Sequence, residues 1–450
     1  VFPTDLSALE RKTEKTEPPI ERPYQKRAIS AVVKGFESSA RGQLIMACGT
    51  GKTLITLWVK ERLKPDTPLV LLPSLNLLAD TLSEWTRHNT KPFEVLCVCS
   101  DQTVGRVGRE EDITVADVPF DVTADEAVIS KFLKLTKTKV IFCTYQSSNL
   151  VGKAQNGALI DLAICDEAHR CAGAKNSAFT DILDDKKIKV SQRLFATATP
   201  RIYSSNVSKS AEARGIDLMG MNNVNSFGPQ FFTYKFSEAI DDQWLTDYQV
   251  VVVGVNEATI QRFIESRELV ITSTGQILDA SSLASKIALI KATADFDLTR
   301  VISFHNRIKS AKNFAFEYQE IFGLVEEIHR PKGSMLADYV SGEMSAAERR
   351  LKIQNLRSLN GFDRALLANS RCLAEGVDVP ALDGVAFIDP RGSEIDIVQA
   401  VGRALRLSKT KTLGTIILPI FLSPDEDVET YVESSQFLPV WNVLKALKSI

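Results

Sequence analysis

The stretch MACGTGKT, Met46–Thr53, is the most informative part of this sequence. The apolar run Leu44–Ala47 leads into it, and Thr53–Leu63 has the pattern of a helix. Gly49 and Gly51 let the backbone curl so that successive N–H groups face one point, where the helix N-terminus adds positive potential. The stretch therefore predicts a strand, a phosphate-binding loop and a helix in direct succession.

The side chains at the end of this loop predict its ligand. The Lys52 ammonium should reach the β- and γ-phosphates of ATP, and the Thr53 hydroxyl should bind Mg²⁺. Met46 stands where the general pattern has glycine, but the positions that wrap the phosphates are intact. The alternative is a glycine-rich turn without a function. We expect ATP to contact Gly49, Thr50, Gly51, Lys52 and Thr53, with Lys52 catalytic.

An acidic pair follows a second apolar run. The expected strand Leu159–Cys165 delivers Asp166 and Glu167 at its C-terminal end. One carboxylate there can hold Mg²⁺ through the water shell of the ion, and the next can polarise the attacking water. We assign the metal to Asp166 and the role of general base to Glu167. The alternative is a solvated turn.

The stretch QAVGRALR, Gln399–Arg406, predicts a second catalytic element. It places Arg403 and Arg406 one helical turn apart, so both should project from one helix face. Two guanidinium groups together suit a triphosphate whose charge spreads during transfer. ATP would then lie between two lobes and close them on binding. The alternative is a helix whose arginines line something else.

Three shorter motifs complete the set. RPYQ, Arg22–Gln25, opens an expected helix, and an amide such as that of Gln25 can read an adenine edge, so Arg22 and Gln25 are assigned to ATP binding. In AEGVDVP, Gly376 permits a tight turn, and Asp378 could accept a ribose hydroxyl or pair with an arginine. The hydroxyls of TATP, Thr197–Pro200, could link the carboxylates to the second lobe.

Apolar runs alternate with helical patterns along the whole chain, which predicts an α/β protein with two tandem doubly wound parallel-sheet domains. We expect a linker or arm at 1–21, an ATP-binding domain at 22–235, a second α/β domain at 236–430 and the start of a truncated helical element at 431–450. The boundary is placed near Tyr234–Val250. An irregular insertion is expected at Asp101–Lys131. The other strands are expected at Leu69–Leu72, Val95–Ser100, Val140–Cys143, Arg193–Ala196, Val301–His305, Leu324–His329, Arg364–Ala368, Gly384–Ile388 and Gly414–Ile420.

The composition is that of an ordinary globular chain. The 450 residues are 44% hydrophobic and 24% charged with a net charge of −2, so there is no global basic footprint for nucleic acid. A large enzyme can still bind phosphates through one local groove. The seven cysteines show no zinc-like spacing, which favours reduced thiols in a cytoplasmic protein. No apolar run reaches about 18 residues, so we expect neither a signal peptide nor a membrane span in this sequence.

Taken in order, the motifs resemble those of superfamily 2 helicases and translocases, and the resemblance extends over nearly the whole chain. RPYQ resembles the Q-type motif, MACGTGKT motif I, PSLNLL (Pro73–Leu78) motif Ia, TYQS (Thr144–Ser147) motif Ib, DEAH (Asp166–His169) motif II, TATP motif III, ISFH (Ile302–His305) motif IV, NSRCLAEGVD (Asn369–Asp378) motif V and QAVGRALR motif VI.

The resemblance implies that both domains are RecA-like and that 236–430 is the C-terminal helicase domain. It also implies that DNA or RNA lies across both lobes. Positions that typically touch the nucleic-acid backbone in the family are matched here, and such contacts carry no sequence information. The His of DEAH does not by itself indicate an RNA enzyme, and motif VI lacks the HRxGR form of RNA helicases. The matched positions are Ser74, Thr144, Gln146, His305 and Ser370.

A closer resemblance is to the motor of Type ISP restriction-modification enzymes and related bacterial helicases. The segments RPYQKRAISAVVKGF, LLPSLNLLADTLSEW, ICDEAHR, ATATPRIY and EGVDVPALDGVAFIDPR carry it. It implies an ATP- and Mg²⁺-dependent motor that pulls duplex DNA without necessarily unwinding it. In that family a nuclease precedes the motor and a methyltransferase follows it. The sequence has neither an NPPY-type motif nor a convincing nuclease set, and both ends read as boundaries of a fragment, so we expect the motor alone.

Two other functions stay open at the level of sequence. One is an RNA helicase or remodeller with the same ATPase core. The other is a non-enzymatic nucleic-acid clamp whose ATP site only gates binding. The complete set of Lys52, Asp166, Glu167, Arg403 and Arg406 argues against the clamp, because a silent site usually loses one of them.

Overall fold

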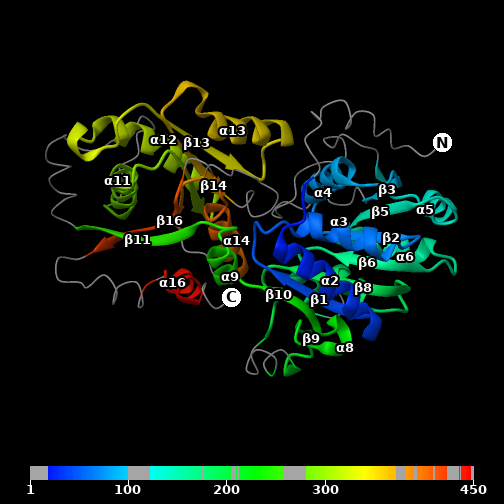
Figure 1. The fold of residues 1–450 in the computed structure, drawn as a ribbon. Helices are drawn as coiled ribbons and strands as arrows, with labels where there is room; N and C mark the ends of the chain where they lie inside the picture. The colour runs from blue at the N-terminus through cyan, green and yellow to red at the C-terminus, as the bar shows by residue number, and fades with distance from the viewer. Residues whose placement is uncertain are drawn as a thin grey trace. The chain divides into compact units, whose positions relative to one another are not determined.

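The computed structural model describes residues 19–99, 122–174, 177–203, 209, 212–256, 280–370, 382–389, 393–408, 411–422, 435 and 437–446. The chain divides into two compact units, Val1–Lys235 and Phe236–Ile450. Each unit is built on its own parallel sheet (Figure 1). The predicted fold class, two tandem RecA-like α/β domains, is confirmed.

The first unit contains an eight-stranded sheet in which all neighbouring strands run parallel. Its central strands are almost completely buried and apolar, as expected of a parallel sheet covered on both faces. In spatial order the strands are β10 (Gln230–Tyr234), β1 (Arg41–Met46), β8 (Val190–Thr197), β6 (Ile160–Cys165), β2 (Pro68–Leu72), β5 (Lys139–Thr144), β3 (Glu94–Val98) and β4 (Val122–Thr123).

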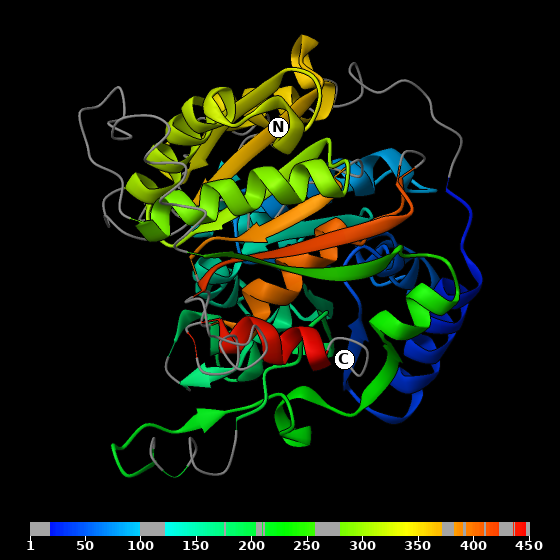
Figure 2. The same cartoon turned by 90° about the vertical axis from the view of Figure 1, so that its left-hand side faces the viewer.

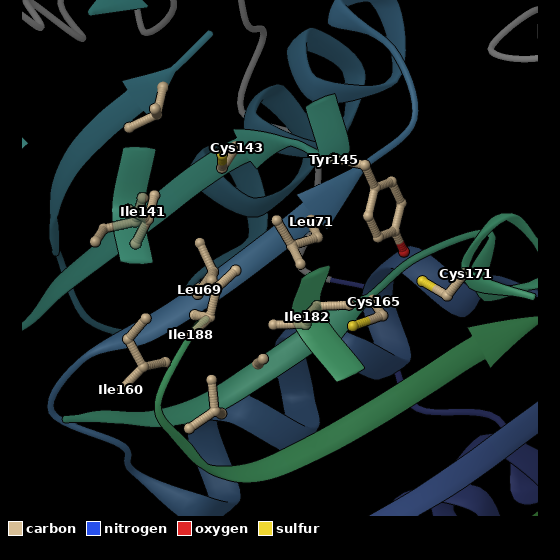
Figure 3. Close-up of a cluster of buried hydrophobic side chains, with 14 of the residues drawn as sticks. Leu69, Leu71, Ile141, Cys143, Tyr145, Ile160, Cys165, Cys171, Ile182 and Ile188 are labelled. Carbon is tan, nitrogen blue, oxygen red and sulfur yellow. The ribbon is translucent and has the colours of Figure 1, made fainter. Parts of the chain in front are cut away.

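Alternating residues of the strands pack on opposite faces of this sheet. On one face, Leu71 of β2 lies in a cluster with Ile129 of α5 (Glu126–Leu133) and Val151 of α6 (Ser148–Ala154). On the other face, the ring of Phe142 in β5 meets Trp85 of α4 (Leu75–His88) edge to face at 5.5 Å. Helices α2 (Pro23–Ser38) and α3 (Lys52–Leu63) pack on one another. Figure 3 shows the first of these clusters.

The second unit contains a six-stranded, wholly parallel sheet. Helices α11 (Ala280–Asp295) and α12 (Ile308–Leu324) pack on it with a shared apolar core. Figure 2 shows α14 (Glu394–Ala404) and α16 (Leu438–Ala446) on the side of the sheet away from α11. Helix α13 (Ala346–Ser358) contacts the edge of the sheet. In spatial order the strands are β11 (Asp247–Asn256), β16 (Leu413–Leu422), β15 (Gly384–Phe387), β12 (Arg300–His305), β14 (Arg364–Ser370) and β13 (Met335–Ser341).

Several local predictions are wrong. The strand expected at Leu324–His329 is absent, because α12 continues through Leu324 and a 3₁₀ turn follows at Glu327–His329. The described end of the insertion predicted at Asp101–Lys131 is not irregular, since α5 begins at Glu126. Residues 100–121 lie outside the described part of the chain. The sequence did not predict β10, β11 or β13.

The described cysteines form no disulfide among themselves, and five of these six thiols are buried. Within the described residues, no helix is both long enough and apolar enough to cross a bilayer.

Candidate nucleotide site

The loop after β1 has the backbone that its glycines predict. Gly49 and Gly51 both have φ of +81°, in the left-handed region that favours glycine. A methyl group on Gly51 would also lie 2.8 Å from the Gln25 amide nitrogen. Gly51 is the N-cap of α3, so the first free N–H groups of the helix follow the loop directly. The backbone is therefore shaped to receive an anion.

Lys52, the first residue of α3, turns back toward the end of β1. Its ammonium group donates to the carbonyl oxygens of Met46 at 3.0 Å and of Ala47 at 3.4 Å. The Thr50 hydroxyl donates to the same Ala47 carbonyl at 2.7 Å. These bonds hold the lysine at the base of the loop, where phosphate oxygens could replace the carbonyls as its partners.

The acidic pair follows β6, which lies two strands from β1 in the sheet. Because both strands run in the same direction, their following loops meet at one edge of the sheet. Asp166 accepts the Glu167 N–H at 3.0 Å, and Glu167 itself adopts a left-handed conformation with φ of +46°. Such strain in a non-glycine residue is typical of functional sites.

The charges of this site keep Glu167 ionised. Burial by itself disfavours the charged carboxylate, but the contact with His169 and the positive charges of Lys52 and Arg170 outweigh it, lowering the pKa of Glu167 to about 2. The nearest ring nitrogen, His169 Nδ1, lies 3.3 Å from Glu167 Oε2. That separation brings the two side chains into contact, but the alignment is not that of a hydrogen bond. A carboxylate this acidic orients water more readily than it accepts a proton.

His169 also connects the acidic pair to the end of β8. Its Nδ1 lies 3.0 Å from Thr197 Oγ1, and the Thr197 hydroxyl also accepts the Thr199 N–H at 3.2 Å. Both side chains are buried. TATP therefore contacts the DEAH segment through His169. His169 lies inside the DEAH motif, but the sequence alone did not predict this role.

Tyr145 is a second residue that the sequence analysis missed. Its hydroxyl donates to the Asp166 carbonyl at 2.7 Å, and the side chain is fully buried. Figure 3 shows this hydroxyl directed toward the segment that carries Cys171. Burial raises the pKa of Tyr145 well above its usual value, so the hydroxyl stays protonated and able to donate. Its neighbours Thr144 and Gln146 were singled out, and the tyrosine between them was not.

The residues of RPYQ lie against the loop. Gln25 Nε2 donates to the Thr50 carbonyl at 3.3 Å, while Gln25 Oε1 accepts the Arg22 N–H at 2.9 Å. The Arg22 guanidinium donates to the Tyr24 hydroxyl at 3.3 Å. Both polar ends of the Gln25 amide therefore have protein partners, and the assignment of Arg22 and Gln25 to the nucleotide stays a prediction.

The donors at this site fit Mg²⁺ held mainly by ATP. Within the part of the chain that the structure describes, no group of three or more His, Cys, Asp and Glu side chains could hold a metal ion. Mg²⁺ commonly takes one or two protein oxygens and completes its shell with phosphate and water. One Asp166 carboxylate and one Thr53 hydroxyl, both on partly exposed residues, suit that mode.

The predicted arginine pair is arranged differently from the expectation. Helix α14 ends at Ala404, so Arg403 lies on the helix and is only 7% exposed, whereas Arg406 lies beyond it. Arg406 forms a bridge with Leu245, and the Leu405 carbonyl accepts the Thr246 N–H at 2.8 Å. These backbone bonds draw the chain away from the helix. The prediction that both arginines project from one helix face is therefore wrong.

The positions predicted to touch nucleic acid are mostly buried in the structure. Ser74 caps α4 by accepting the Leu77 N–H, and the Thr144 hydroxyl donates to Ser147. His305 and Ser370 face one another in register at the ends of β12 and β14, and both are 0% exposed. Phosphate contact by these two side chains would require them to become accessible. Gln146 is partly exposed, and its amide nitrogen lies 3.5 Å from the Pro73 carbonyl. Gly376 and Asp378 lie outside the described residues.

A parallel sheet whose C-terminal edge carries a glycine loop of this shape and an Asp-Glu pair is typical of nucleotide-hydrolysing domains, and a second parallel sheet follows it in the chain. The sequence matches two protein families in the same order: "Type III restriction enzyme, res subunit" at residues 19–202 and "Helicase conserved C-terminal domain" at residues 287–408. These matches identify in the chain the two domains of a superfamily 2 helicase and support an ATP-hydrolysing enzyme of the helicase type.

Similar proteins extend this result over the whole chain. The DNA-bound Type ISP restriction-modification enzyme LlaBIII matches 99% of the chain with a TM-score of 0.80 and 29% identity, and the chain covers 31% of it. A second similar structure is that of a nuclease-deletion mutant of the Type ISP enzyme LlaGI in complex with a DNA substrate mimic. It matches 94% of this chain with a TM-score of 0.62 and 26% identity, and this chain covers 28% of it.

A curated viral relative has a similar extent of match. The "Probable helicase" of African swine fever virus is 29% identical over 412 residues, which are 91% of this chain and 42% of that protein. The chain thus spans less than half the length of this relative and about a third of the two restriction enzymes.

Proposed function

We propose that this chain is an ATP-dependent motor that moves along duplex DNA and serves a bacterial restriction-modification or phage-defence enzyme. The observation that carries the proposal is the match of 99% of the chain, with a TM-score of 0.80, to a Type ISP enzyme bound to DNA. The relation to a second Type ISP enzyme bound to a DNA mimic supports the same substrate class.

In this proposal the residues of the first unit divide the chemical work. The loop N–H groups and Lys52 bind the phosphates, and Thr53 and Asp166 hold Mg²⁺, which neutralises phosphate charge. Glu167 orients the attacking water from a carboxylate that stays ionised. His169, Thr197 and Tyr145 fix the position of the acidic pair through the contacts described above. Arg403 or Arg406 supplies the positive charge that stabilises the transition state.

The proposal extends to the partners and the setting of the protein. Duplex DNA would be bound through its backbone, without reading of sequence by the motor itself. Nuclease and methyltransferase domains would flank the motor in a longer polypeptide of the cytoplasm.

Steady-state ATP hydrolysis tests this proposal. The rate is measured without nucleic acid and then with duplex DNA, single-stranded DNA or RNA of equal length. We expect duplex DNA to stimulate hydrolysis most. Stimulation by RNA alone would contradict the DNA assignment and favour an RNA remodeller, and ATP binding without turnover under every condition would favour the non-catalytic clamp.

A further inference from the structure

Tyr24 holds the phosphate-binding loop but is not placed to hold a nucleotide base. It is 0% exposed, and its hydroxyl donates to the Thr50 carbonyl at 2.8 Å. One face of its ring is covered by Tyr234, with the ring centroids 4.4 Å apart and the planes inclined by 8°. A base cannot stack on a ring that has no exposed surface. The hydroxyl and the ring therefore join the loop to Tyr234.

Tyr234 is joined to the same loop a second time, through the backbone. Strand β10 pairs in parallel with β1, where Tyr234 is the register partner of Met46, and the Tyr234 carbonyl accepts the Ala47 N–H at 2.9 Å. Met46 and Ala47 are also the residues whose carbonyls hold the Lys52 ammonium. A lysine that exchanges these carbonyls for phosphate oxygens would change the environment of both residues.

The packing around β10 leaves little room for independent movement. The ring of Phe231 fills the space next to two glycines, Gly42 of β1 and Gly35 of α2. A methyl group added to Gly42 would lie 2.0 Å from this ring, and one added to Gly35 would lie 2.3 Å from it. Phe231 also meets Phe36 of α2 edge to face at 5.1 Å. A shift of the loop end of β1 is therefore passed to β10 rather than absorbed between them.

Strand β10 ends one residue before the first unit ends. Lys235 is the last residue of that unit, and Phe236 begins both the second unit and α9 (Phe236–Asp241). The loop, Tyr24 and Tyr234 thus form one contact chain that reaches the covalent junction between the units.

We propose that Tyr24 and Tyr234 are positioning residues that transmit the nucleotide state of the phosphate-binding loop to the junction at Lys235–Phe236. The inference rests on the proposed function only in that the loop must bind ATP. The coupling requires the stacked aromatic ring at position 234, and the Tyr24 hydroxyl strengthens it.

Hydrogen–deuterium exchange tests the coupling. Exchange is followed in peptides covering the loop and residues 235–246, with and without Mg²⁺ and a non-hydrolysable ATP analogue, in the wild type and in Tyr234→Ala, Tyr234→Phe and Tyr24→Phe. We expect the analogue to change exchange at 235–246 by at least about fivefold in the wild type and in Tyr234→Phe. Tyr234→Ala should lose this response while the loop itself is still protected, and Tyr24→Phe should show a reduced response.

The steady-state kinetics should separate coupling from a general loss of structure. For Tyr234→Ala we expect kcat to fall at least about fivefold while KM changes less than about threefold, with Tyr234→Phe restoring kcat. If Tyr234→Ala does not fold, Tyr24→Phe becomes the test. An analogue-dependent change in exchange at 235–246 as large in Tyr24→Phe as in the wild type then overturns the inference. The same response at 235–246 in a folded Tyr234→Ala also overturns it. If the ATP analogue does not protect the loop of the wild type from exchange, the proposed ATP site is contradicted. The proposed coupling is then contradicted as well.

Discussion

His169 Nδ1 lies 3.0 Å from Thr197 Oγ1, and this bond ties the segment after β6 to the end of β8. The same histidine nitrogen lies 3.3 Å from the Glu167 carboxylate. The position of the predicted general base therefore depends on a hydroxyl 30 residues further along the chain, and the bond can be removed without touching any residue assigned to phosphate or metal.

Thr197→Val removes this hydroxyl and keeps the size of the side chain. We expect the rate of ATP hydrolysis to fall by about tenfold, because the free energy of about one hydrogen bond is lost from the transition state. Nucleotide affinity should be nearly unchanged. Thr197→Ser restores the hydroxyl and should restore most of the rate. Equal rates in the valine variant and the wild type would show that the bond does not position Glu167 for catalysis.

Lys52→Ala removes the ammonium that is held at the base of the loop. Hydrolysis should fall by at least about 100-fold, because no other side chain of the loop carries a positive charge to the phosphates. The control is Lys34→Ala on the exposed face of α2, which should hydrolyse ATP at the wild-type rate. Retained turnover in Lys52→Ala would place the phosphate site elsewhere.

Glu167→Gln keeps the shape of the side chain and removes its charge. We expect ATP to bind as in the wild type while hydrolysis slows by about 100-fold or more. Nucleotide binding is followed by displacement of a fluorescent analogue, and turnover by phosphate release. Loss of binding together with turnover would mean that Glu167 has a structural role, consistent with its strained backbone.

Replacement of each arginine of motif VI by alanine should separate their roles. Arg406 lies outside the helix and is partly exposed, so Arg406→Ala should lower turnover by about 1,000-fold and leave folding intact. The buried Arg403 should contribute to stability as well, so Arg403→Ala should lower the melting temperature. Unchanged turnover in Arg406→Ala would move the catalytic role to Arg403 or to another residue.

Lys411 should make the stability of the protein depend on pH in the alkaline range. Its ammonium group donates to the carbonyl oxygens of Leu382 at 2.7 Å and Ala404 at 2.8 Å. Burial nevertheless lowers the pKa of Lys411 to about 8. The negative charge of Asp383 opposes this shift, and the positive charge of Arg406 adds to it. Between pH 8 and the ordinary lysine pKa, the unfolded chain binds more protons than the folded one, so stability rises with pH.

Chemical unfolding at pH 7.5 and pH 9.5 measures this effect. The wild type should gain stability at the higher pH relative to Lys411→Met, which cannot titrate at this position. An equal pH dependence of the two proteins would show that Lys411 is protonated throughout this range in the folded state.

The sequence predicted the parts of the fold that are buried on both faces. Strand β6 is apolar and buried except at Asp161, so both the strand and the position of Asp166 at its end could be predicted. Strands β10 and β13 lie at sheet edges and carry partly exposed residues such as Asp338 and Tyr339, so they show no such run.

Two features of the site depend on contacts that no local pattern contains. Arg406 leaves the helix because the Leu405 carbonyl accepts bonds from Thr246, 159 residues earlier in the chain. His169 gains its role from Thr197, which reaches it only because β6 and β8 are neighbours in the sheet. Arg406 and His169 both lie in motifs that the sequence shows, but the partners of these two residues follow only from the fold.

We propose that the chain moves along duplex DNA at the expense of ATP, and displacement of a triplex-forming strand tests this claim. A labelled third strand is bound to a long duplex, and its release is followed after addition of Mg²⁺ and ATP, with Lys52→Ala as the inactive control. We predict ATP-dependent release by the wild type, with a delay that grows with the length of duplex before the triplex, and none by Lys52→Ala. Hydrolysis stimulated by duplex DNA without any release of the third strand would contradict the claim.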